Sequence, residues 1–271
     1  MLRVKNFVKA AVNYADVVAL KTIPMYRDNK KYTAELNYWK GEFNNLSKWY
    51  NEGILDWWGI PPPSAEKKLS FSSIWATNAV MTMHHIRPSY LEELQIECDC
   101  FRGKKVLEVG CGPLAPILQF SDCIRHGLDP LLNMYIDAGW PLYDYDAKFV
   151  NGKGESMPYV DQYFDVVISV NALDHVDDFR KTASEIQRVL KVGGELYFDI
   201  EYHEATVTEP LELNDTIVRE SFSSCDMKKV IERGKRDMFQ AIVNRFGLIP
   251  NRFDHFTNDE RFVTWHGKRT K

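Results

Sequence analysis

The sequence predicts an α/β fold preceded by a helical, aromatic-rich extension, and three observations carry that prediction. From residue 104 onward, short apolar runs of strand length alternate with stretches of helical periodicity. The first of these runs ends at two glycines, Gly110 and Gly112. Such a pair is typical of the turn from a strand into a helix in an α/β protein. Residues 1–100 instead space their apolar side chains as helices do, without the alternation of strands.

The stretch at residues 104–112, Lys-Lys-Val-Leu-Glu-Val-Gly-Cys-Gly, organises the rest of the sequence. Its apolar residues predict a buried strand, and glycines two apart let the backbone turn tightly against a ligand. Prolines at 113 and 116 suit the first turn of a helix, which we predict over residues 114–123. Such a turn aims backbone N–H groups at an anionic ligand. A merely tight turn, or a dinucleotide-binding Gly-x-Gly-x-x-Ala turn, would fit the same residues.

Glu108, two residues before the first glycine, separates these alternatives. The order Glu-Val-Gly-Cys-Gly resembles motif I of the class I S-adenosylmethionine (SAM)-dependent methyltransferases. The resemblance implies that Glu108 orders the loop and faces the methionine end of SAM. It also implies that Gly110, Cys111 and Gly112 form the cofactor turn. Leu114 stands where many members have a third glycine.

A second strand is predicted over residues 124–129, and it ends in Gly-Leu-Asp-Pro. An acid about 20 residues beyond such a glycine turn binds ribose hydroxyls. Asp129, followed by Pro130, is placed for that contact, and a plain Asp-Pro turn is the alternative. A short helix over residues 131–138 and a short strand over residues 147–150 follow.

The loop at residues 154–159 and the apolar run that ends at residue 170 resemble the adenine side of the same family. The residues that this resemblance places at the adenine are Gly154, Glu155, Ser156 and Met157. Lys153 stands where an acid often binds the adenine amino group, which leaves a main-chain carbonyl as the alternative partner. Asn171 and Ala172, directly after the strand, match the family loop that lies under the cofactor.

Three matching stretches in the correct order cover residues 104–200, including a helix predicted over residues 178–190 and a strand over residues 195–200. A nicotinamide dehydrogenase would not be expected to reproduce the second and third stretches. The resemblance implies a Rossmann-like class I methyltransferase sandwich, mostly parallel with one antiparallel strand. It also implies a SAM-binding domain over residues 101–271.

Two histidines and two acids are the candidates for catalysis. An alcohol must lose its proton as it attacks a methyl group, which favours a histidine that titrates near neutrality. His175 follows the carboxyl end of a strand, where active sites of open α/β sheets lie. Asp174, Asp199 and His203 could orient that base or share its role. A structural role for His175, and an exposed loop pair for His203 and its neighbour Glu204, remain the alternatives.

The ends of the chain complete the prediction. A helix is expected over residues 36–50 with Thr33 as N-cap, and the aromatic-rich residues 1–100 are expected to form a lid over the crevice or ordinary core packing. Residues 201–224 are expected to be an active-site loop. Residues 227–243 are expected to form an amphipathic helix, with residues 247–256 and 261–265 as a closing hairpin.

Composition excludes several classes of protein. A net charge of −4 and a pI near 6.0 give no reason to expect a nucleic-acid partner. The five cysteines lack paired metal spacing and indicate reduced thiols in a cytoplasmic protein. No membrane span or signal peptide is predicted. We also predict no metal, although Asp174, Asp199, His203, Glu204 and Glu209 would supply ligands for one.

These patterns predict a SAM-dependent enzyme that methylates a hydroxyl of a small molecule or of a sugar or polysaccharide precursor. The aromatic extension and the histidine-containing loops resemble those of bacterial sugar- and polysaccharide-modifying O-methyltransferases. A small-molecule N-methyltransferase and a non-catalytic SAM-binding module are the alternatives. A nucleic-acid methyltransferase is disfavoured, because Asn171-Ala-Leu-Asp174 is not the motif such enzymes carry after the fourth strand. The sequence predicts no oligomeric state.

Overall fold

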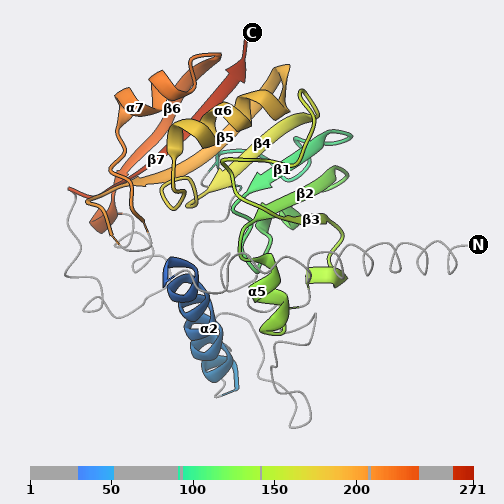
Figure 1. Ribbon diagram of the computed structural model, residues 1–271, viewed down its shortest axis with the longest axis vertical. Helices are drawn as coiled ribbons and strands as arrows, with labels where there is room; N and C mark the ends of the chain where they lie inside the picture. Colours follow the sequence, from blue (N-terminus) through green and yellow to red (C-terminus); the bar gives the residue numbers. More distant parts are fainter. Residues whose placement is uncertain (1–29, 52–90, 92–93, 141, 207–208, 238–258) are drawn as a thin grey trace, which may run out of the picture.

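The computed structural model confirms the predicted α/β fold, a Rossmann-like sandwich around one mixed sheet (Figure 1). It describes residues 30–51, 91, 94–140, 142–206, 209–237 and 259–271. The seven strands are β1 (Lys105–Val109), β2 (Ile124–Asp129), β3 (Lys148–Asn151), β4 (Phe164–Val170), β5 (Leu190–Tyr202), β6 (Cys225–Gly234) and β7 (Arg261–Arg269). Their order across the sheet is β3-β2-β1-β4-β5-β7-β6, and β7 runs antiparallel to both of its neighbours.

Helices cover both faces of this sheet. The described helices are α2 (Lys30–Asn51), η2 (Pro116–Gln119), α5 (Leu132–Asp137), η3 (Leu142–Asp144), α6 (Phe179–Val189) and α7 (Asp215–Ser221). Helices α6 and α7 pack on one face, whereas α5 and η2 pack on the other. Figure 1 shows α2 beyond the carboxyl ends of the parallel strands.

The central strands are buried on both faces because successive side chains point to opposite sides of a strand. Val106 of β1 belongs to the core shared with α5, and Leu107 belongs to the core shared with α6 and α7. In β4, Ile168 and Val167 divide in the same way. The continuous apolar runs seen in the sequence are therefore the signature of parallel strands covered on both faces.

The helix predicted over residues 114–123 is wrong, because this segment contains only the 3₁₀ helix η2. Ala115 adopts a left-handed backbone conformation, with φ of +45°. A left-handed residue and two nearby prolines prevent a regular α-helix. The short form still presents the backbone N–H of Ile117, which donates to Glu108 Oε2 at 3.0 Å.

The amphipathic helix predicted from residue 227 is also wrong over residues 227–234, because residues 225–234 form strand β6 at the edge of the sheet, and within its described part only residues 235–237 are helical. Charged side chains suit such an exposed edge strand. The hairpin partner of β7 is accordingly β6, and residues 247–256 lie outside the described residues. The predicted loop at residues 201–224 contains α7, whose N-cap Asn214 accepts from the Ile217 N–H at 3.0 Å.

The extension contains the predicted helix, but α2 begins at Lys30, so Thr33 lies inside the helix and is not its N-cap. Leu36 and Trp39 of α2 pack against the α5-side core. The remaining aromatic residues of the predicted lid, from Trp57 to Trp75, lie outside the described residues. The division of the chain at residue 100 stays a prediction. Among the described helices, none combines the length and the apolar character that crossing a membrane requires.

His126 of β2 makes stability depend on pH. Its side chain is buried edge-on against Tyr159, Tyr163 and Phe164. Neither ring nitrogen has a hydrogen-bond partner among the described residues. Burial lowers the pKa of His126 to about 4, and the positive charge of the nearby Lys148 contributes to this lowering.

The unfolded chain therefore binds this proton more tightly than the folded protein does. Stability from this group is complete above the unfolded pKa of about 6.5 and is lost as the pH falls toward 4. We expect His126→Phe to reduce the loss of unfolding free energy between pH 7 and pH 4.5 by roughly 2–3 kcal/mol relative to the wild type. Denaturant unfolding at the two pH values measures this, and parallel losses in both proteins would contradict it.

Candidate active site at the carboxyl edge of the sheet

The turn after β1 brings two loops together at the carboxyl edge of the sheet. Gly110 has φ of +76°, and its N–H donates to the carbonyl oxygen of Leu128 at 2.8 Å. A Cβ at Gly110 would lie 2.3 Å from the Cβ of Ala172, in the loop after β4. Only glycine fits here, because any side chain would overlap that loop. Gly112, with φ of +55°, lies under Trp39 of α2, whose ring is 3.6 Å from an added Cβ.

Asp129 ends β2 and is held by this turn. Its Oδ2 accepts from the Gly112 N–H at 2.9 Å, and its Oδ1 accepts from the Leu131 N–H at 2.8 Å. Burial raises the pKa of Asp129 to about 6. A carboxylate has about four acceptor positions, so each oxygen retains capacity for one further donor. The carboxylate can therefore bind two neighbouring hydroxyl groups, as the ribose of a nucleoside would supply.

Glu108 and Cys111 support the turn from below. Glu108 is fully buried and orders the loop through the N–H of Ile117. Burial raises the pKa of the Cys111 thiol well above its ordinary value, and the negative charges of Asp129 and Glu108 contribute to this rise. Cys111 is therefore an uncharged, packed side chain that fills the α5-side core.

The loop at residues 153–157 is tied to α6. A Cβ at Gly154 would lie 2.8 Å from Thr182 Cγ2, so this backbone touches the helix directly. Glu155 Oε1 accepts from the N–H groups of residues 177 and 178, at 2.7 and 3.1 Å. Met157 is buried in the α6-side core, whereas Ser156 is exposed. The side chains of Glu155 and Met157 thus hold the loop in place, and its contact with adenine stays a prediction.

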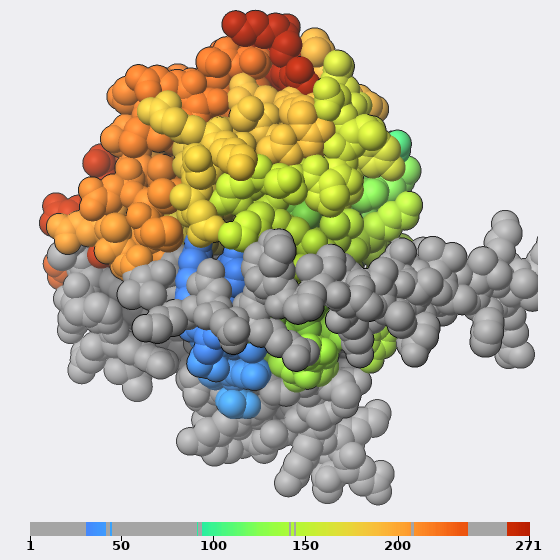
Figure 2. Space-filling model, in the orientation of Figure 1, coloured from blue at the N-terminus to red at the C-terminus, as the bar shows by residue number. Residues whose placement is uncertain are grey.

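Helix α2 is attached to this loop by charge. Asp177 accepts from Lys153 at 2.6 Å and from Lys31 of α2 at 2.9 Å. Figure 2 shows α2, in blue, directly against the rest of the fold at this edge. These pairs therefore join α2 to the carboxyl edge of the sheet, and the role of residues 1–100 as a lid stays a prediction.

Asp174, His175, His203 and Glu209 gather beside the turn, together with Glu35 of α2. His175 Nε2 lies 3.5 Å from Glu209 Oε1, and its Nδ1 lies 3.7 Å from Glu35 Oε2. His203 Nε2 lies 3.8 Å from Asp174 Oδ2 and 3.9 Å from Glu209 Oε2. The carboxylate of Asp174 raises the pKa of His203 to about 9, and the negative charge of Glu209 contributes to this rise. We refer to these five residues as the acid–histidine cluster.

Three of the four predicted catalytic residues, Asp174, His175 and His203, belong to this cluster. The fourth, Asp199, accepts from the Thr264 hydroxyl at 2.9 Å, and burial raises its pKa. Its backbone carbonyl accepts from the N–H of Asn171, which has φ of +50° and is exposed. Asp199 therefore connects β5 to β7 and to the loop that carries the cluster.

Sequence reasoning missed Glu35 and did not assign Glu209 a catalytic role. Glu35 has one signal, because it lies one helical turn before Trp39 and accepts from its Nε1–H at 3.0 Å. Glu209 lies in a loop without periodicity, and only the fold brings it to His175.

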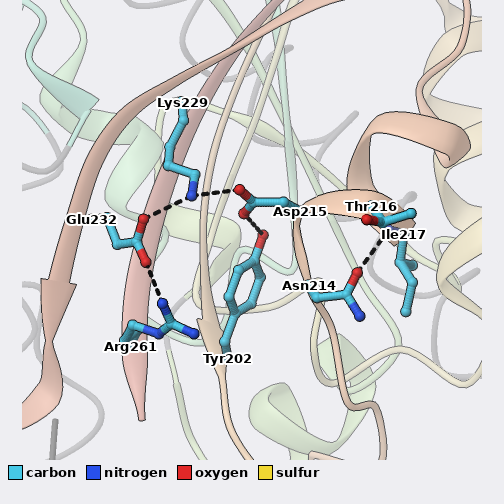
Figure 3. A pocket seen from close by; sticks show the side chains of 8 residues that line it. All are labelled: Tyr202, Asn214, Asp215, Thr216, Ile217, Lys229, Glu232 and Arg261. Atoms are coloured by element: carbon cyan, nitrogen blue, oxygen red, sulfur yellow. Dashed lines mark hydrogen bonds and ion pairs between the residues drawn. The ribbon is translucent and has the colours of Figure 1, made fainter. Parts of the chain in front are cut away.

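A separate pocket of about 550 Å³ lies between α7 and the β6–β7 hairpin (Figure 3). Its charged groups pair with one another. Lys229 Nζ lies 2.6 Å from Asp215 and 2.7 Å from Glu232, which also pairs with Arg261 at 2.7 Å. The Tyr202 hydroxyl donates to Asp215 at 3.1 Å. A ligand would have to displace these pairs, so the acid–histidine cluster is the better candidate site.

Comparison with known proteins agrees with this geometry. A family model described as a methyltransferase domain matches residues 107–198. A sterol 24-C-methyltransferase of Gibberella zeae is 37% identical over 101 residues, which are 34% of this chain and 26% of that protein. A ubiquinone biosynthesis O-methyltransferase of Vibrio atlanticus is 29% identical over 150 residues, which are 51% of this chain and 62% of that protein. The chain thus spans less than two thirds of the length of these curated relatives.

Solved structures share the fold. The phosphoethanolamine N-methyltransferase 2 of Haemonchus contortus in complex with S-adenosyl-L-methionine superposes with a TM-score of 0.52 at 14% identity. The match covers 78% of this chain and 63% of that one. At this identity the similarity concerns the fold alone.

The contact between Gly110 and Ala172 can be tested directly. Gly110→Ala should lower the free energy of unfolding by about 2–5 kcal/mol, because it adds left-handed strain to overpacking. Adding Ala172→Gly removes the overlapping Cβ, so the double variant should recover about 1–3 kcal/mol of that loss. Denaturant unfolding of the two single variants and the double variant measures the coupling. Simple additivity of the two changes would show that the loops do not touch.

Proposed function

We propose that this chain, which matches a methyltransferase-domain model over residues 107–198, transfers a methyl group from SAM to a hydroxyl of a small molecule. A sugar or polysaccharide precursor is the acceptor class that we favour. The match at residues 107–198 supports the methyltransferase domain. The curated relatives include enzymes named for C- and O-methylation, so the acceptor atom is part of the proposal.

One observation carries the proposal: the cofactor turn touches the loop that carries Asp174 and His175 of the acid–histidine cluster. Gly110 contacts Ala172, and His175 follows three residues later in the same loop. A methyl donor held at the turn therefore lies next to the only histidines that the described residues place at this edge. Positioning donor and acceptor in line supplies much of the rate enhancement in such a transfer.

The chain's own residues have distinct roles in this proposal. Bound SAM supplies an electrophilic methyl group on a positively charged sulfur. Asp129 holds the ribose hydroxyls, and Glu108 keeps the turn ordered. His175 takes the proton from the acceptor hydroxyl, and the carboxylates of Glu35 and Glu209, at 3.7 and 3.5 Å, stabilise the imidazolium that forms. Helix α2 covers the crevice and excludes water.

Methylation of an amine is a second candidate, and the charge of the cluster favours it. Glu35, Asp174 and Glu209 place three carboxylates around His175. A cationic amine would be attracted to such a group of acids, and it would need a base only to lose its own proton. Mass analysis of methylated products from a mixed panel of alcohols and amines distinguishes the two. A panel that gives no product while the cofactor binds would favour a non-catalytic SAM-binding module.

The Asp129 carboxylate predicts how cofactor affinity depends on pH. Only the ionised group accepts from two backbone N–H groups and two hydroxyls together. Because the pKa of Asp129 is about 6, affinity for S-adenosylhomocysteine should be constant above pH 7 and should fall as the pH drops through 6. Asp129→Asn should weaken binding by about 10–100-fold, because charge-assisted hydrogen bonds contribute about 1.5–3 kcal/mol.

Calorimetry between pH 5 and pH 8 measures both effects, and the Asp129→Asn protein should show a flat profile. A nicotinamide dinucleotide is the control ligand and should not bind. Tight binding of that dinucleotide, with none of S-adenosylhomocysteine, would overturn the cofactor assignment.

His175 predicts a separate loss of turnover. If it is the proton acceptor, His175→Ala should lower the rate with the best acceptor of the panel by roughly two orders of magnitude. The affinity for S-adenosylhomocysteine should change little, since Asp129 and the glycine turn remain. Transfer of labelled methyl groups measures the rate. Near-normal turnover would assign His175 a structural role.

A further inference from the structure

Asp174 is a buried acid whose carboxylate makes no hydrogen bond to the described residues. Its side chain is fully buried in the loop after β4, and neither carboxylate oxygen has a hydrogen-bond partner among the described residues. The nearest histidine nitrogen, Nε2 of His203, is 3.8 Å away. Burial of an unpaired carboxylate is costly unless a cation or several donors accompany it. Two other buried acids at this edge have hydrogen-bond donors. Asp129 accepts from two backbone N–H groups, and Asp199 accepts from the hydroxyl of Thr264.

Potential ligand atoms surround this carboxylate. One oxygen of Asp174, one nitrogen of His175 and one oxygen of Glu209 all lie within 4.8 Å of one another. The closest measured pair, His175 Nε2 and Glu209 Oε1, is 3.5 Å apart, which is too long for a good hydrogen bond. Two ligands bonded to one cation at about 2.1 Å are about 3.0–3.4 Å apart in octahedral or tetrahedral geometry. The three side chains would therefore have to move closer together, from separations of up to 4.8 Å, to bind one metal ion.

Neighbouring groups orient the two histidines as metal-binding histidines are oriented. His203 Nδ1 lies 2.6 Å from the carbonyl oxygen of Glu204, so this nitrogen donates and Nε2 faces Asp174 and Glu209. His175 turns Nδ1 toward Glu35 and Nε2 toward Glu209. A carboxylate or a backbone carbonyl on the far ring nitrogen is the usual outer partner of a histidine that binds a metal.

We propose that Asp174, His175 and Glu209 bind a divalent first-row transition-metal cation, with His203 beside it as a fourth donor. Imidazole nitrogen together with carboxylate oxygen favours zinc or manganese over magnesium and calcium, which prefer oxygen ligands alone. The cation offsets the charge of two acids at the cluster. A proton on His203 is the rival way to offset that charge.

The inference rests on the proposed function for its role, since the acceptor hydroxyl would lie at this cluster. The cation would take over the ionisation of that hydroxyl from His175, which becomes a ligand. The acceptor oxygen would bind the cation as a further ligand, its O–H bond would break, and the proton would leave to water. The resulting alkoxide would then form the new O–CH₃ bond while the S–CH₃ bond of SAM breaks, and S-adenosylhomocysteine would leave with the bonding electron pair.

Metal binding can be measured without an acceptor. The full chain, stripped with a chelator and dialysed, is titrated with MnCl₂ followed by electron paramagnetic resonance, and with ZnCl₂ followed by calorimetry. We expect one equivalent of either metal to bind. Glu209→Gln and Asp174→Asn should each weaken binding about tenfold or more. Glu212→Gln is the matched control, because Glu212 is exposed in the same loop and should bind metal as the wild type does.

Two results would overturn the inference: no saturable binding by the wild type, or equal binding by the wild type and Glu209→Gln. Either result would leave a proton on His203 as the compensating charge. Glu209 lies in a surface loop, so its variant tests the site even if Asp174→Asn does not fold. Binding of S-adenosylhomocysteine is measured on the same samples. Metal binding without nucleoside binding would support the metal site and contradict the methyltransferase function. Nucleoside binding without metal binding would support the methyltransferase function and contradict the metal site.

Discussion

The site depends on the close approach of two loops at the carboxyl edge of the sheet. Gly110 has no side chain, and this lets the loop after β1 lie against Ala172 in the loop after β4. The first loop holds Asp129 through the N–H of Gly112, and the second carries Asp174 and His175. Neighbouring parallel strands deliver both loops to the same edge. The turn that we propose binds the nucleoside of SAM is therefore in contact with the loop that carries His175.

Three buried acids at this edge differ in their hydrogen-bond partners. Asp129 accepts two backbone N–H groups, and Asp199 accepts the hydroxyl of Thr264. Asp174 has no such hydrogen bond among the described residues and lies near two histidines. Since burial of a carboxylate is unfavourable unless its charge is compensated, the difference separates two acids with local structural partners from Asp174, for which we propose a cation. This contrast is the reason that we propose the chemistry at Asp174 rather than at Asp199.

Helix α2 connects the two halves of the site. Trp39 lies over Gly112, Glu35 lies beside His175, and Lys31 pairs with Asp177. Each contact joins the extension to a different part of the edge: the cofactor turn, the acid–histidine cluster and the loop before α6. A movement of α2 would therefore expose the turn and remove a carboxylate from His175 together. We therefore propose that the extension contributes residues to the candidate active site.

The sequence by itself determined the parts of this protein that depend on local pattern. The strands from β1 to β5, the glycine turn, helix α6 and the acid at the end of β2 were predicted because burial on both faces and a tight turn leave clear local signals. Tertiary structure alone decided the rest. Residues 225–234 have a helix-like pattern but pair with β7 as an edge strand, since hydrogen bonding to a neighbouring strand overrides a weak local preference. Glu35 and Glu209 reach His175 across long separations in the chain, and no local pattern encodes a contact that only folding creates.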